Sequence, residues 1–265
     1  MDRHRWQECY TLTIQFWLTT LMRSLCLPFL TLLLLLVNSG AQAIVLVAAE
    51  LPPYVIRSSH GKPSGVAIEI MEEAARRLKE PLTIELMPLA RALTQTAHRK
   101  DVLLIPPVRS SQREHLYYWV TPILDEEFVI VSDRTPHPTP LKLKDLPSLK
   151  VGALRHSFGQ YLLKQRLNLA SQTVATEDLN ALKLQRGRID AWVAAWNVIL
   201  YNQQTGGFSI DEIVKGESLM RTQLFIAASK DFPFTEGRRW QAVIDDMRLD
   251  GTLARILKQY DYQAP

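Results

Sequence analysis

Short apolar runs alternate with amphipathic stretches through the first half of the chain. Three segments have the apolar or alternating pattern of β-strands, and two place apolar side chains on one face at helical spacing. Strands and helices alternate in chain order at residues 44–49, 66–78, 82–86, 89–97 and 102–105. This order predicts a parallel sheet with helices on both faces.

The segments that follow these strands are expected to converge on one cleft. Ligands of open parallel sheets bind beyond the carboxyl ends of the strands. Residues 51–54, 87–91 and 106–113 occupy these positions. We therefore look for binding residues in these three segments first.

The alternation restarts after a proline-rich stretch at residues 135–140. One strand-like run precedes this stretch at residues 127–132, and another lies late in the chain at 224–228. Two amphipathic helices are predicted at the end of the chain, at residues 234–248 and 252–260. Three strand–helix pairs lie between the two strand-like runs, at residues 150–154 and 159–169, 172–175 and 177–186, and 189–194 and 196–203. The sequence has no repeat, but this pattern predicts two βα units of similar size.

The N-terminal region carries a predicted export signal. Arg23 is followed by an apolar run at residues 25–37 and by Ala41-Gln42-Ala43, the basic start, short apolar core and A-x-A exit of a secretory signal peptide. The apolar core is shorter than the roughly 20 residues that span a bilayer, although an uncleaved anchor is the alternative. We expect cleavage after Ala43 and a periplasmic protein. Residues 1–21 form an upstream extension, and the true start is Met1 or Met22.

Composition narrows the possible functions. The two cysteines, Cys9 and Cys26, precede the predicted cut, so the mature chain has no disulfide, thiol nucleophile or cysteine zinc site. The net charge of +4 comes without a long basic run, which argues against nucleic acid. The sequence has no nucleophile elbow, zinc-protease motif or phosphate-binding glycine loop, and its histidines lack ligand spacing. We predict no catalytic residue, metal or cofactor.

Two segments suit the binding of an anion. Arg109 and Arg113 follow a strand, and a guanidinium forks onto carboxylate or phosphate. On spacing alone, the more frequent alternative is that both are solvated loop arginines. Ser157 lies between a strand and a helix, where free backbone N–H groups favour an anion, and a plain helix N-cap is the compatible alternative. Trp192 and Trp196 lie near a strand end, either as pocket walls or as core.

The ordered motifs of the chain resemble the bacterial extracellular solute-binding proteins of family 3. The matching pieces run in the family's order over residues 44–262: Leu51-Pro52-Pro53-Tyr54, the Gly61 to Gly65 turn, Pro88-Leu89-Ala90-Arg91, residues 101–113, Trp119 with Thr121-Pro122-Ile123, Val151-Gly152, Gly187-Arg188-Ile189-Asp190-Ala191, and Leu249-Asp250-Gly251-Thr252 with Leu257 and Tyr260. Each motif is weak alone, and the ordered set is strong.

The resemblance implies an α/β, two-lobed periplasmic binding protein type II fold. Each lobe is a mostly parallel sheet flanked by helices, and two crossover strands join the lobes. We place the hinge strands at about 127–132 and 222–229, lobe 1 at 44–128 plus 229–265, and lobe 2 at 133–222. Ligand would bind between the lobes and drive hinge closure.

The resemblance also assigns roles to residues and reveals departures. Arg113 falls where amino-acid-binding members carry the arginine that pairs with the ligand's α-carboxylate, and Ser157 matches the lobe 2 loop that helps hold it. The hydroxyl residues that precede this arginine are replaced by Pro106-Pro107-Val108. The aspartate that pairs with the ligand's ammonium is replaced by Ala195, so a standard α-amino acid is not expected.

We expect a monomeric binding protein, not an enzyme, that captures a small anionic or zwitterionic solute for an inner-membrane ABC permease or a membrane sensor. The alternatives are a cyclohexadienyl dehydratase-like periplasmic enzyme on the same fold and a free-standing sensor input. Arg113 is the expected clamp, with Ser157 and Phe158 opposite. The remaining expected site residues are Tyr54, Leu89, Pro107, His156, Trp192 and Trp196, with Arg109 and Arg91 as second-rank contacts.

Overall fold

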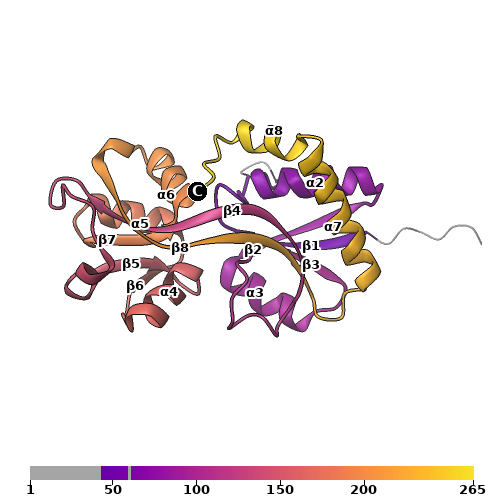
Figure 1. The fold of residues 1–265 in the computed structure, drawn as a ribbon, viewed down its shortest axis with the longest axis horizontal. Coiled ribbons are helices and arrows are strands. Elements are labelled where there is room, and N and C mark those ends of the chain that lie inside the picture. The colour runs from indigo at the N-terminus through magenta and orange to yellow at the C-terminus, as the bar shows by residue number, and fades with distance from the viewer. Residues whose placement is uncertain (1–42, 59–60) are drawn as a thin grey trace, which may run out of the picture. The chain divides into compact units, whose positions relative to one another are not determined.

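The computed structural model describes residues 43–58 and 61–265, and all statements below concern this part of the chain (Figure 1). Residues 1–42, with nearly all of the predicted signal segment, lie outside the described residues. None of the described helices is long and apolar enough to cross a membrane.

Eight strands form one hydrogen-bonded sheet. They are β1 (Ile44–Glu50), β2 (Leu82–Pro88), β3 (Val102–Ile105), β4 (Tyr118–Asp133), β5 (Val151–Leu154), β6 (Gln172–Val174), β7 (Ala191–Ala195) and β8 (Ile213–Ala228). The spatial order is β2-β1-β3-β8-β4-β7-β5-β6. Strands β1–β3 pair in parallel at one end and β5–β7 at the other, and the long antiparallel pair β4–β8 joins them (Figure 1). These are two parallel lobes connected by two crossover strands.

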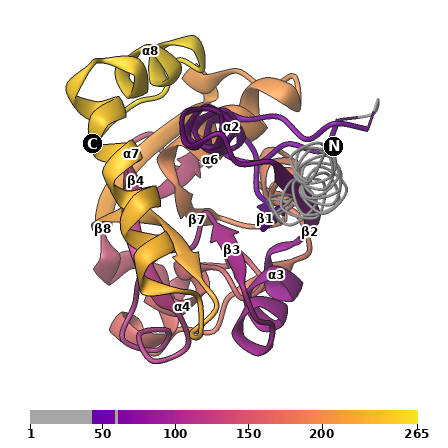
Figure 2. The ribbon, with the colours of Figure 1, turned by 90° about the vertical axis from the view of Figure 1, so that its right-hand side faces the viewer.

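Seven α-helices pack on this sheet. They are α2 (Val66–Leu78), α3 (Leu89–His98), α4 (Phe158–Leu167), α5 (Glu177–Gln185), α6 (Trp196–Thr205), α7 (Phe234–Leu249) and α8 (Thr252–Gln259), together with 3₁₀ turns at Leu143–Ser148 and Ile210–Glu212. Helices α2 and α3 lie on opposite sides of β1 and β3 (Figure 2). The first half is therefore the predicted βαβαβ unit.

The alternation of side chains along β1 builds two apolar layers. Leu46 and Ala48 belong to the large core cluster that includes the buried face of α2, whereas Val47 and Ala49 pack with the buried residues of α3. Successive side chains of a strand point to opposite faces, so a continuous apolar run is buried on both sides. This explains why residues 44–49 lack the alternation of a half-exposed strand.

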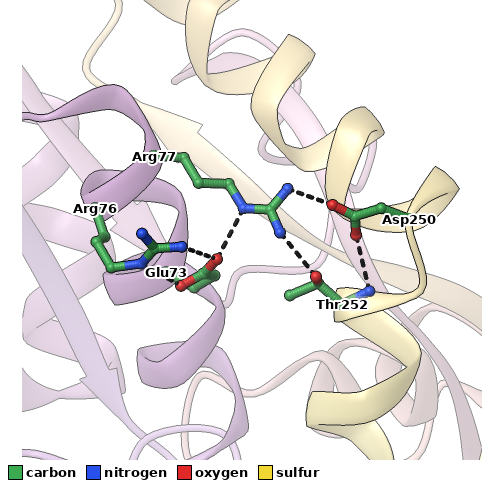
Figure 3. A network of polar contacts seen from close by, with 5 residues as sticks. All are labelled: Glu73, Arg76, Arg77, Asp250 and Thr252. Carbon is green, nitrogen blue, oxygen red and sulfur yellow. Dashed lines mark hydrogen bonds and ion pairs between the residues drawn. The ribbon is translucent and has the colours of Figure 1, made fainter.

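The C-terminal helices are tied back to α2 by an ion-pair network (Figure 3). Arg77 donates to Asp250 Oδ2 at 2.6 Å from Nη1, to Thr252 Oγ1 at 2.7 Å from Nη2 and to Glu73 Oε1 at 2.8 Å from Nε. Arg76 donates a further bond to Glu73 Oε1 at 2.7 Å. Residues far apart in sequence thus pack against the same helix.

The two crossover strands are much longer than the sequence pattern predicts. Residues 127–132 and 224–228 have the apolar character of strands, but β4 and β8 each extend over 16 residues. Pro122 lies beside a register shift in the β4–β8 pairing, where proline is tolerated, and Lys215 and Glu217 lie on the half-exposed β8. Pairing between the two strands overrides these weak local signals. The residue limits of the lobes stay a prediction.

Candidate functional site

A small cavity lies where the segments after the strands meet. Its volume of about 30 Å³ has room for roughly two water molecules. Most of the lining is apolar, and it is contributed by Leu51, Tyr54, Leu89, Pro106, Pro107, Val108, Arg113, Phe128, Ser157, Phe158, Glu177, Ala195, Val198 and Leu224. The convergence predicted from the strand ends is present, and six of the eleven predicted site residues line this cavity.

Arg113 contributes a buried guanidinium to the cavity. The residue is 9% exposed, and the guanidinium donates to two carbonyl oxygens, that of His156 at 3.0 Å and that of Val108 at 3.4 Å. Within the described residues no carboxylate lies within ion-pair distance of Arg113. Burial lowers the pKa of this guanidinium. Among the described residues, the acceptors of this cation are therefore backbone carbonyl oxygens and not a carboxylate.

The start of α4 lies next to Arg113, because the guanidinium donates to the carbonyl oxygen of His156 just before the helix. Ser157 is the N-cap of the helix, and its hydroxyl accepts a hydrogen bond from the backbone N–H of Gln160 at 3.2 Å. Phe158 packs edge-on against Phe128 of β4, with the ring centroids 5.1 Å apart. The N-cap interpretation of Ser157 is thus realised, and its place in the lining keeps the hydroxyl beside the ligand space.

Tyr54 also lines the cavity and is held by a tight turn. Gly65 precedes α2 with a φ of 116°, and a Cβ atom there would lie 2.5 Å from the carbonyl oxygen of Tyr54. The Tyr54 hydroxyl donates to Glu126 Oε2, which also accepts from Asn197 Nδ2 at 2.9 Å and from the Tyr262 hydroxyl at 3.1 Å. Burial raises the pKa of Glu126 and, together with that carboxyl, raises the pKa of Tyr54 well above its usual value.

Glu177 is a site residue that the sequence reasoning missed. It is the first residue of α5, 7% exposed, and it lines the cavity. Its Oε2 accepts hydrogen bonds from Asn180 Nδ2 at 2.7 Å and from the Trp192 indole Nε1 at 2.9 Å. Burial raises the pKa of this carboxyl to about 7. The signal was available, because Glu177 follows strand β6 and so lies where ligand contacts are expected.

The two tryptophans do not form walls of this cavity. Trp192 is fully buried in β7, consistent with the core alternative, and reaches the site only through its bond to Glu177. Trp196 begins α6, where its indole donates to Gln263 Oε1 at 2.8 Å and Lys215 Nζ lies 4.5 Å from the ring centroid. Neither residue is part of the described lining.

The remaining predicted residues lie around the cavity. Arg109 forms an exposed ion pair with Glu114 at 2.6 Å, and Arg91 is exposed outside the lining. His156 lines a wider neighbouring groove of about 770 Å³ between α3 and α4, which also includes Arg113 and Ser157. Leu89 and Pro107 are part of the apolar lining.

The fold and the position of the cavity define the class of protein: a two-lobed periplasmic binding protein of type II. The chain belongs to the bacterial extracellular solute-binding proteins, family 3, whose family model matches residues 43–263. This confirms the resemblance found in the sequence. The comparison with curated proteins gave no match.

Solved structures share the fold at low sequence identity. A histidine kinase sensor domain with similarity to periplasmic binding proteins has a TM-score of 0.75 and 18% identity, over 84% of this chain and 97% of that chain. A mutant of ArgBP from T. maritima has a TM-score of 0.72 and 20% identity, over 84% of this chain and 96% of that chain. A substrate-binding protein of an ABC uptake transporter from Streptococcus pneumoniae, with bound histidine, has a TM-score of 0.74 and 13% identity, over 82% of this chain and 92% of that chain.

Proposed function

We propose that this protein captures a small anionic or zwitterionic solute between its two lobes, without chemical turnover, in the periplasm. Arg113 holds the acid group of the solute, and the start of α4 completes the clamp. The single observation that carries the proposal is the buried Arg113 guanidinium, which has no carboxylate partner among the described residues. A buried cation is costly until a counter-ion reaches it, so the site favours an anion.

Capture requires the lobes to move. The cavity of about 30 Å³ is too small to enclose a solute of several heavy atoms, so enclosure of such a solute there needs separation of the walls. Two contacts connect the segment after β3 with the α4 region: Arg113 to the His156 carbonyl at 3.0 Å, and Ser111 Oγ to the Tyr161 hydroxyl at 3.0 Å. A solute that bridges the same segments would favour the closed form over the open one.

Delivery to an inner-membrane ABC permease is the proposed use of the captured solute. The family and the likeness to the binding protein of an uptake transporter support this role. The likeness to a histidine kinase sensor domain supports a membrane sensor as the second candidate partner. Deletion of the protein separates the two, because loss of solute uptake indicates transport and loss of a transcriptional response with normal uptake indicates sensing.

A thermal-shift screen of carboxylates and zwitterions tests the capture proposal. A ligand that binds only the folded protein raises the melting temperature with concentration. We expect Arg113→Ala to weaken binding of a hit by about 30-fold or more, because charge-assisted hydrogen bonds to the acid group are lost. Arg109→Ala is the matched control, since that arginine is exposed and paired with Glu114. A far-UV spectrum verifies that each variant is folded. Unchanged binding by folded Arg113→Ala would contradict the clamp.

A further inference from the structure

Two charged side chains line an otherwise uncharged cavity. Arg113 and Glu177 are the charged residues in its described lining, and both are almost fully buried. Arg113 comes from the segment after β3, whereas Glu177 comes from the segment after β6. The two charges therefore belong to different lobes of the proposed division and meet the same ligand space from different sides.

Arg113 and Glu177 do not form an ion pair with each other. The Arg113 guanidinium donates to the carbonyl oxygens of His156 and Val108. Glu177 Oε2 accepts instead from Asn180 Nδ2 and the Trp192 indole. No Arg, Lys or His of the described residues forms an ion pair with Glu177. The cavity thus has a cationic group beside Val108 and His156 and an acidic group held by Asn180 and Trp192.

The position next to the start of α6 offers no third polar group. Ala195 ends β7 and lines the cavity with a methyl group. The family resemblance implies that amino-acid-binding members carry the partner of the α-ammonium at this position, and Ala195 supplies none, so an ammonium next to the captured carboxylate would be left unpaired. An unpaired buried charge is strongly unfavourable. Within the described lining of the cavity, Glu177 carries the only carboxylate that a ligand cation could meet.

We propose that Glu177 binds a cationic group of the ligand, and that this group is separated from the acid group at Arg113 by several bonds, as in an ω-amino acid. This inference rests on the proposed capture of a carboxylate by Arg113. Asn180 and Trp192 hold Glu177 Oε2 from behind and fix the carboxylate before the ligand arrives. Such fixed groups bind without a further ordering cost.

Isomeric probes separate the position of the ammonium from every other ligand property. We use pentanoate, 2-aminopentanoate and 5-aminopentanoate, with the corresponding butanoate and hexanoate sets, in titration calorimetry with the wild-type protein. Within a set the carbon chain is constant, and only the presence and place of the ammonium change. We expect the ω-amino member to bind about tenfold or more tightly than both other members, as one charge-assisted contact allows.

Glu177→Gln tests the residue assignment, and Asp178→Asn is the control because Asp178 is the exposed neighbouring acid. We expect Glu177→Gln to remove the preference for the ω-amino member while the unsubstituted acid still binds, and Asp178→Asn to keep the preference. A second measurement is proton release. At pH 6 the free Glu177 carboxyl is largely protonated, so binding of a cation should release a proton, seen as a buffer-dependent enthalpy that Glu177→Gln abolishes.

The outcomes of these experiments distinguish failure of the Glu177 assignment from failure of the proposed capture by Arg113. Binding of the unsubstituted acids that needs Arg113, without any ω-amino preference, would leave the capture proposal intact and overturn the role of Glu177. An ω-amino preference that persists in Glu177→Gln would overturn the role equally. Failure of every member of all three sets to bind would count against both.

Discussion

The buried carboxyl of Glu177 makes the stability of the protein depend on pH in a definite direction. Its pKa is about 7 in the folded protein against an ordinary value of 4.5, chiefly because of burial. Between these values the folded protein holds a proton that the unfolded chain has lost, so the free energy of unfolding falls as pH rises. A shift of about 2.5 pKa units corresponds to about 3 kcal/mol, fully expressed above pH 7.

Glu177→Gln removes this titration while keeping an acceptor for the two donors. A glutamine Oε1 occupying the same place still accepts from Asn180 Nδ2 and the Trp192 indole. We therefore expect the variant and the wild type to have similar stability near pH 5, and the variant to be more stable by up to about 3 kcal/mol at pH 8. Urea unfolding without added ligand, at half-unit steps between pH 5 and 8, measures this difference.

Glu73→Gln provides the control. The hydrogen bond from Arg76, followed by that from Arg77, holds the pKa of Glu73 at about 2, against 4.5 ordinarily. Its stabilisation is complete above pH 4.5 and is lost as pH falls toward 2, so Glu73→Gln should cost stability by the same amount at pH 5 and pH 8. A difference between Glu177→Gln and wild type that is likewise flat over this range would refute the assignment of a raised pKa to Glu177.

Two further predictions concern stability alone. Arg77→Ala should lower the free energy of unfolding in urea by about 1 to 2 kcal/mol, because it removes partly exposed bonds to Glu73, Asp250 and Thr252. A loss of stability that disappears in high salt would support these ion pairs, and an unchanged stability at low salt would contradict them. Glu126→Ala should cost about 2 to 4 kcal/mol because buried donors lose their acceptor, and Glu126→Gln should cost clearly less; equal costs would contradict the network.

The elements that could be predicted from sequence are those whose burial follows a simple period. Helix α2 and strand β3 have the predicted limits, because each presents an unbroken apolar face or run to the core. The first parts of β4 and β8 escaped prediction, because Asp125, Glu126 and the polar residues of β8 mask the pattern. Their strand conformation comes from pairing with each other, which a local pattern does not contain.

The residues of the site likewise divide into those with a local sequence signal and those without one. Arg113 could be found because it follows a strand and matches a family motif, and its side chain lines the cavity. Trp192 could not be assigned, since an aromatic residue near a strand end is equally suited to core and wall. The structure places its ring in the core and leaves only the indole N–H directed at Glu177.

Glu177 is difficult to recognise from sequence, because an acidic residue at the start of a helix already has a structural explanation. An acidic residue in the first turn of a helix interacts favourably with the helix dipole, and α5 begins with Glu177 and Asp178. The dipole accounts equally well for both acids, but Asp178 is exposed and Glu177 is buried. What separates them is the buried Trp192 indole, which Glu177 alone reaches. The carboxylate that we assign to the ligand's cation is therefore distinguished from Asp178 by a core tryptophan of strand β7, a contact that exists only in the folded protein.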